Sequence, residues 1–303
     1  MRRIVYEIKH ITENKYMGSV SVSHLLMHLT PRDDDRQSLL SHELSVDPVP
    51  AVATWHGDYF GNTTRFLTVD RAHTRLTVTS TSRVAVGPAF VPDPTETPAW
   101  EIVRARCRSD HSGQSLEAHE FTYPSTLVPV GPEFSEYSAK SFEKQRPLLD
   151  AVLHLTQRIY TEFKFDPTAT TVTTPVSEVM RHRRGVCQDF AQFQIACLRS
   201  MGVPARYVSG YLETDPPPGQ TKLRGVDASH AWVGFFCPGI GWIDIDPTNN
   251  CFASMRHITL GWGRDYADVC PIRGVLVGGM DQHMTVSVDV AALTSLEEDT
   301  APE

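Results

Sequence analysis

Hydrophobic and polar residues alternate along the first part of the chain. Apolar side chains recur at every second position in residues 5–11, 19–26, 66–69 and 75–80, which is the period of a strand with one buried face. Turn-forming residues separate these segments at Pro48–Pro50, His56–Asp58 and Gly61–Asn62. The pattern predicts a β-rich domain over residues 1–130, built as an antiparallel β-sandwich.

The period lengthens to that of a helix after about residue 140. Positions 148, 152, 155 and 159 are apolar and lie on one helical face. The pair Thr174–Pro175 predicts the start of a short helix, which Gly185 ends. A further helix is expected to begin at or near Cys187 and to stop before Gly202.

Strands return in the last third of the chain, where we expect them at 205–212, 231–237 and 241–246. The turn Pro238–Gly241 joins the last two into a hairpin. Residues 283–290 alternate again as a terminal strand, and residues 293–303 are expected to form a flexible tail. These elements predict an α+β protein with a second domain over residues 131–292.

The composition is that of an ordinary globular protein, with 41% hydrophobic and 21% charged residues. A formal net charge of −8 argues against nonspecific nucleic-acid binding, which needs a basic surface. No apolar run approaches the roughly 18 residues of a membrane span, and Met1–His10 lacks the apolar stretch of a signal peptide. Six cysteines without a C-x-x-C pair predict a reduced, cytoplasmic protein.

Cys187 differs from the other cysteines because it follows a glycine at the start of a predicted helix. The positive end of a helix dipole favours a thiolate, which is the nucleophilic form of cysteine. The unpaired N–H groups of the first turn can also stabilise the oxyanion of a tetrahedral intermediate. An isolated cysteine is most often a core residue, but this placement favours a nucleophile.

His230 and Asp246 flank the predicted hairpin. His230 lies about nine residues before the turn and Asp246 about seven after it, so antiparallel pairing brings them within a residue or two of facing each other. A histidine beside a thiol can accept its proton, and a carboxylate can orient that imidazole. Taken alone, His230 could be an ordinary hydrogen-bonded histidine and Asp246 a turn residue before Pro247. Asp244 lies on the same strand face and is an alternative carboxylate.

Three segments resemble the transglutaminase-like core, a fold shared with papain-type cysteine enzymes: Arg184–Ala191, Pro204–Tyr211 and Gly241–Asn249. Other positions are similar to the bacterial transglutaminase N-terminal region or to the end of such proteins: Tyr6, His10, Val46–Pro48, Phe60–Asn62, His73 and Gly263–Val269. The resemblance covers nearly the whole chain, from about residue 3 to residue 290. It implies that the β-sandwich is attached to a papain-like, transglutaminase-like core.

The resemblance also implies a catalytic triad of Cys187, His230 and Asp246. Asp246 is preferred to Asp244 because the family places its carboxylate directly before Pro-Thr. The implied chemistry is acyl transfer from a peptide or glutamine amide, through a thioester and without a cofactor. We expect a protein or peptide substrate and water as the acceptor. A primary amine acceptor, which would make the protein a cross-linking enzyme, and a scaffold without catalytic activity are the alternatives.

The residues that would bind substrate are less well defined. Papain-type enzymes place a glutamine oxyanion donor six residues before the nucleophile, where this chain has Arg181. Gln188 is a candidate for that role. Tyr207, Tyr211 and Trp232 are candidates for the acyl pocket, although packing within strands is the commoner role of such residues.

Metal binding is not expected. Asp33–Asp35 lack the spaced ligands and the distal glutamate of a calcium loop. His24 and His28 lie in a strand-like segment without an acidic partner. The basic run Arg181–Arg184 before Cys187 would favour acidic substrates, or would simply complement the C-terminal dipole of a solvated helix end.

Overall fold

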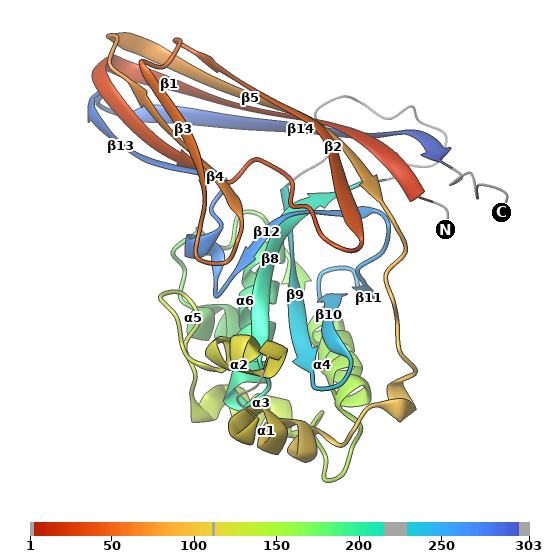
Figure 1. Cartoon of the computed structure of the whole chain (residues 1–303). Coiled ribbons are helices and arrows are strands. Elements are labelled where there is room, and N and C mark those ends of the chain that lie inside the picture. Colours follow the sequence, from red (N-terminus) through yellow and green to blue (C-terminus); the bar gives the residue numbers. More distant parts are fainter. Residues whose placement is uncertain (1–2, 111–112, 215–228, 297–303) are drawn as a thin grey trace, which may run out of the picture.

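The computed structural model describes residues 3–110, 113–214 and 229–296 (Figure 1). Within these ranges, a long curled sheet lies against a core in which helices pack on a second sheet. The α-helices lie between Trp100 and Ser200, with antiparallel strands before and after them, so the predicted α+β class is confirmed.

The curled sheet is built on β1, which pairs along both of its edges. Along one edge, β4 and β5 pair with successive parts of β1. Along the other edge, β13 and β14 do the same. β2 and β3 extend the sheet from β5 and β4. Its seven described strands are β1 (Arg3–Met27), β2 (Gln37–Asp47), β3 (Val52–Gly57), β4 (Thr63–Val69), β5 (His73–Val86), β13 (Ile272–Gly278) and β14 (Gln282–Leu296). The predicted sandwich is thus a single antiparallel sheet that curls over its own apolar side chains, among them Val20, Met27 and Leu76.

The core sheet has the strand order β11-β10-β9-β8-β12, with antiparallel neighbours. Its strands are β8 (Ala205–Leu212), β9 (Ser229–Cys237), β10 (Gly241–Asp246), β11 (Cys251–Phe252) and β12 (His257–Gly263). The helix α6 (Cys187–Ser200) packs across β8 and β9. Apolar side chains of Phe193, Val233 and Ile245 meet in this core. The helices and the hairpin expected around residue 187 and residues 231–246 are confirmed.

Further helices lie in the same part of the structure as α6. They are α1 (Trp100–Ser109), α2 (Gly113–His119), α3 (Pro132–Ala139), α4 (Leu148–Glu162) and α5 (Val176–His182). Short 3-10 turns lie at Pro94–Glu96, Glu120–Thr122 and Tyr266–Asp268. Two short parallel strands, β6 (Lys164–Phe165) and β7 (Arg184–Gly185), lie on either side of α5 in the sequence. The helix predicted from the apolar positions 148, 152, 155 and 159 is confirmed as α4.

Two segments lie in a different part of the structure from the one that a division at residue 130 predicts for them. Trp100, Val103 and Cys107 of α1 are buried in the helical core rather than in the β-rich part. β13 and β14, at the other end of the chain, pair with β1. The curled sheet therefore draws on both ends of the sequence, and the core is formed by its middle. β14 also continues to Leu296, past the predicted start of the tail, while residues 297–303 lie outside the described residues.

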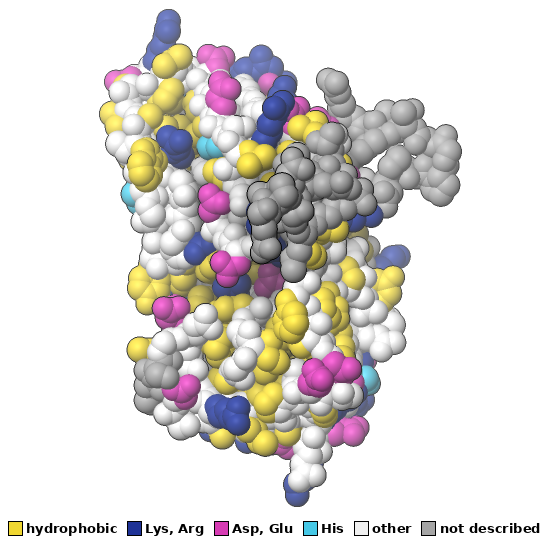
Figure 2. Space-filling view, turned by 45° about the vertical axis from the view of Figure 1, so that its right-hand side comes forward, with side chains coloured by type: hydrophobic (Ala, Val, Ile, Leu, Met, Phe, Trp, Pro, Cys, Tyr) yellow, Lys and Arg dark blue, Asp and Glu magenta, His cyan; other side chains and the backbone are white. Residues whose placement is uncertain are grey.

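The two parts share an apolar contact. Tyr211 and Ile258 of the core sheet are buried together with Tyr6, Val84 and other residues of the curled sheet. None of the helices in the described residues is long and apolar enough to cross a membrane. On the face shown in Figure 2, basic and acidic side chains are interspersed over both parts.

Candidate active site

Cys187 is the first residue of α6 and is half-buried. Asp189, in the first turn, is buried and accepts the Val186 N–H at 2.8 Å and the Thr170 hydroxyl at 2.6 Å. A Cβ atom on residue 185 would lie only 2.5 Å from Oδ2 of Asp189. Gly185 is therefore required for a close approach, and the preceding helix α5 already ends at His182. These contacts fix the position of Cys187 at the start of α6.

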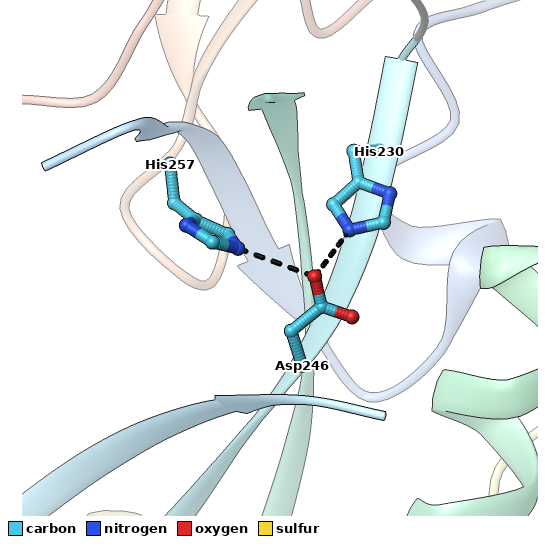
Figure 3. Close-up of side chains that lie close together, drawn as sticks. All are labelled: His230, Asp246 and His257. Atoms are coloured by element: carbon cyan, nitrogen blue, oxygen red, sulfur yellow. Dashed lines mark hydrogen bonds and ion pairs between the residues drawn. The ribbon is translucent and has the colours of Figure 1, made fainter. Parts of the chain in front are cut away.

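His230 and Asp246 lie side by side on β9 and β10 (Figure 3). The hairpin pairs Ile245 with Val233, so the next residue, Asp246, lies about two positions from His230 in the ladder. His230 Nε2 is 2.6 Å from Asp246 Oδ2. The sequence prediction that the hairpin brings the two residues within a residue or two of facing each other is confirmed. Because Nε2 donates to the carboxylate, Nδ1 is the ring nitrogen left for the thiol.

The electrostatics of the pair favour charge on both residues. Burial acts to lower the pKa of His230, but hydrogen bonds with Asp246 and Cys187 outweigh it and raise that pKa to about 10. Burial acts to raise the pKa of Asp246, but hydrogen bonds from His230 and His257 hold it well below its usual range. At neutral pH the site therefore contains an imidazolium held by a carboxylate.

Asp246 has several hydrogen-bond partners besides His230. Its Oδ1 accepts the backbone N–H groups of Thr248 at 2.8 Å and Asn249 at 3.2 Å. Its Oδ2 accepts the side-chain amide of Asn249 at 2.7 Å and lies 3.2 Å from Nε2 of His257 (Figure 3). Sequence reasoning missed Asn249 and His257 as members of the site. Asn249 could have been found, because it lies in the turn-forming segment just after Asp246. No local pattern in the sequence points to His257.

Asp244, the alternative carboxylate, has different partners. Its Oδ2 accepts the indole N–H of Trp232 at 3.1 Å, and its Oδ1 lies 3.8 Å from the Arg206 guanidinium. Arg206 is buried and stacks on the rings of Trp242 and Trp262. The structure therefore brings Asp246, rather than Asp244, to His230.

The four proposed substrate-binding residues lie in different surroundings. Tyr207, Tyr211 and Trp232 are each at most 2% exposed. The Tyr211 hydroxyl bonds to His10 of the curled sheet, and the Trp232 ring packs edge-on against His257. Gln188 donates its side-chain amide to the Val172 carbonyl at 3.2 Å. Their role in binding substrate stays a prediction.

The segments considered for metal binding have protein partners. His24 bonds to Thr68, and His28 contacts Asp58 and the Cys270 carbonyl. Asp34 accepts the backbone N–H groups of two residues in its own loop. The ligand-type atoms of His230, Asp246 and His257 lie within 4.8 Å of one another, which is compatible in distance with a cation site. That no metal or other cofactor is needed stays a prediction.

Comparisons with known proteins identify the family. The model described as the bacterial transglutaminase-like N-terminal region matches residues 6–85, and the model of the transglutaminase-like superfamily matches residues 136–247. An uncharacterized protein of Mycobacterium tuberculosis is 42% identical over 293 residues, which is 94% of this chain and 92% of that protein. The chain belongs to the transglutaminase-like superfamily. Cys187, His230 and Asp246 all lie inside the second matched range, whereas His257 lies beyond it.

Other relatives of this transglutaminase-like protein are more distant or more local. A protein-glutamine gamma-glutamyltransferase of Pseudomonas aeruginosa is 40% identical over 68 residues, covering 22% of this chain and 10% of that enzyme. The crystal structure of a proposed cysteine protease from Cytophaga hutchinsonii superposes with a TM-score of 0.77. That match is 21% identical and covers 100% of this chain and 94% of the other, so the two proteins share their fold.

Proposed function

We propose that the protein is a cysteine-dependent enzyme that cleaves peptide or glutamine amides through a thioester on Cys187. The observation that carries this proposal is the 2.6 Å contact between His230 Nε2 and Asp246 Oδ2, in a histidine whose pKa Cys187 also raises. This is the arrangement by which a base is oriented beside a nucleophile. A scaffold without catalytic activity has no need of a charged histidine and carboxylate held together out of water.

The reaction has two steps. The Cys187 thiolate attacks the amide carbonyl carbon, and His230 donates its proton to the departing amine as the C–N bond breaks. The acyl group is then a thioester on Cys187. Water attacks that thioester while His230 accepts a proton, and the carboxylic acid leaves as the C–S bond breaks. Asp246 keeps the imidazole oriented in both steps.

The first turn of α6 is suited to the oxyanion of each tetrahedral intermediate. An α-helix leaves its first N–H groups without intrahelical acceptors, and these lie at the positive end of the helix dipole. Cys187 is itself in this turn. Its backbone N–H is our candidate oxyanion donor, with Gln188 as the candidate for a second donor.

The acceptor distinguishes two related activities. Hydrolysis by water needs no second binding site, which makes it the preferred reaction. Transfer to a primary amine is the second candidate, favoured by the 40% identity over 68 residues to the gamma-glutamyltransferase of P. aeruginosa. Incubation with a glutamine-containing protein and a fluorescent primary amine separates them. Label in the protein indicates transfer, while ammonia or new chain ends without label indicate hydrolysis.

The first experiment asks whether Cys187 is an activated thiol. Wild-type protein and His230→Ala would be alkylated with iodoacetamide at about pH 6, where an ordinary thiol is almost wholly protonated. The reference is a free cysteine peptide in the same solution, whose thiol has the ordinary pKa of about 8.5. We expect Cys187 to react at least about 10-fold faster than this peptide, and only when His230 is present. Equal rates for Cys187 and the peptide, or no effect of His230→Ala, would contradict the proposal.

A further inference from the structure

We propose that His257 is a positioning residue that holds the Asp246 carboxylate in place for His230, and that the curled sheet holds His257. This inference rests on the proposed function, because it assigns a role within the same site. His257 is the first residue of β12, at the edge of the core sheet next to β8. Its ring is 3% exposed and lies against the Trp232 ring.

The hydrogen bonds of His257 determine which ring nitrogen carries the proton. The backbone N–H of Ser254 points to Nδ1 at 3.1 Å, so Nδ1 must be an acceptor without a proton of its own. The single proton of the neutral ring is then on Nε2. That nitrogen lies 3.2 Å from Asp246 Oδ2 and donates to it. His257 therefore acts on the carboxylate as an N–H donor in a fixed orientation.

The two histidines reach the same oxygen from different strands. His230 on β9 and His257 on β12 both donate to Oδ2, with ring centroids 6.0 Å apart (Figure 3). Asn249 adds a third donor to Oδ2, while two backbone N–H groups hold Oδ1. A carboxylate with donors on both oxygens cannot rotate without losing several hydrogen bonds. His257 thus limits the freedom of the group that orients the general base.

The curled sheet supplies the contacts that hold the start of β12. Arg36, just before β2, donates to the carbonyls of Ser254 at 2.9 Å and His257 at 3.1 Å. Gln37, which is fully buried, pairs through both ends of its amide with the backbone of Thr259, each bond being 2.8 Å long. The segment from Ser254 to Thr259 is thereby fixed from outside the core. Through these contacts the curled sheet holds His257, and His257 in turn holds Asp246 beside His230.

The side chains of His230, Asp246 and His257 lie close enough together to form a cation site, but their hydrogen bonds disfavour one. A metal ligand must present a lone pair, and Nε2 of His257 instead presents a proton to Asp246. Binding a cation there would require Nδ1 to take the proton, which would place two N–H groups against each other at Ser254. The donor geometry therefore favours a positioning histidine.

Two substitutions separate the two ends of the His257 ring. Asparagine places a polar atom near Nδ1, so His257→Asn can keep the Ser254 bond but cannot reach Asp246. Glutamine places its amide near Nε2, so His257→Gln can keep the donor to Asp246. Both variants lose the ring that packs on Trp232, so they are matched in their loss of packing.

We expect His257→Asn to lower the rate of Cys187 alkylation at about pH 6 and kcat by about 10- to 100-fold, with KM little changed. His257→Gln should stay within a few-fold of wild type, and the two variants should have similar Tm values. Equal losses in both variants would overturn the inference. If His230→Ala slows alkylation while His257→Asn does not, the proposed function survives and this inference fails. If neither slows it, both fail.

A second measurement needs no variant. NMR of the wild-type protein with 15N-labelled histidine distinguishes a protonated from an unprotonated ring nitrogen. At neutral pH we expect His257 to carry its proton on Nε2 and none on Nδ1. Finding the proton on Nδ1, or a loss of the Nε2 proton when zinc is added at stoichiometric concentration, would overturn the assignment of His257 as a donor to Asp246.

Discussion

Asp244 and Asp246 point to the same face of β10 but hold different partners. Asp246 Oδ2 lies 2.6 Å from His230, whereas Asp244 Oδ2 accepts the indole N–H of Trp232. Both carboxylates are close to buried aromatic and basic groups, so their residue type and spacing alone do not separate them. Their hydrogen bonds do, because only a direct contact can orient the imidazole.

The first prediction compares these two carboxylates. Asp246→Asn removes the charge that stabilises the His230 imidazolium, and we expect kcat/KM to fall by about 10³- to 10⁴-fold. Asp244→Asn should leave kcat/KM within about 10-fold of wild type and lower the free energy of unfolding by about 1–3 kcal/mol, through Trp232 and Arg206. Steady-state kinetics and denaturant unfolding measure the two effects. A larger kinetic loss in Asp244→Asn would assign the orienting role to Asp244.

The second prediction concerns pH. The pKa of His230 is raised to about 10, so the imidazolium is present at neutral pH and is lost only as the pH rises through about 10. Amide turnover needs that proton for the leaving amine and should fall with an apparent pKa near 10. Alkylation of Cys187 needs only the thiolate and should not fall over the same range.

The two pH profiles are measured on one protein preparation. Turnover of a peptide or glutamine amide gives the first, and mass spectrometry of carboxamidomethylated Cys187 gives the second. A parallel decline of both above pH 10 would indicate loss of the fold rather than of the proton. A decline of turnover centred near the ordinary histidine pKa of about 6.5 would contradict the raised value.

The sequence was informative where the structure is local. His230 and Asp246 belong to one hairpin, so counting residues from the turn was enough to bring them together. The helical spacing of Trp100, Val103 and Cys107 was also present, although the segment was assigned to the β-rich part. Reading that 3.6-residue period would have placed α1 among the helices.

His257 and its support could not be predicted in this way. Arg36 and His257 are 221 positions apart, and their contact depends on how the curled sheet meets β12. Such long-range pairing leaves no periodic signal in a single sequence. The return of β13 and β14 to β1 is of the same kind, because an alternating segment does not reveal which strand it will pair with.

The third prediction tests the link between the curled sheet and the site. Arg36→Met keeps the apolar stem but removes the bonds to the carbonyls of Ser254 and His257. We expect Cys187 alkylation at about pH 6 to slow by a few-fold, less than in His257→Asn. Arg83→Met is the control, because the exposed Arg83 bonds to the half-buried Glu7 on the same sheet and such surface pairs contribute at most about 1 kcal/mol. Equal alkylation rates in the two variants would show that the curled sheet does not influence the active site.

The fourth prediction concerns the glycine before the nucleophile. In Gly185→Ala the new Cβ would meet the Asp189 carboxylate at 2.5 Å, so Asp189 must move and its bond to the Val186 N–H must weaken. We expect the free energy of unfolding to fall by about 1–3 kcal/mol, and Cys187 alkylation to slow because the first turn of α6 shifts. Gly57→Ala is the control, since a Cβ at residue 57 meets nothing within 4 Å. If Gly185→Ala matched Gly57→Ala in both denaturant unfolding and alkylation, the contact between Gly185 and Asp189 would not be what fixes the position of Cys187.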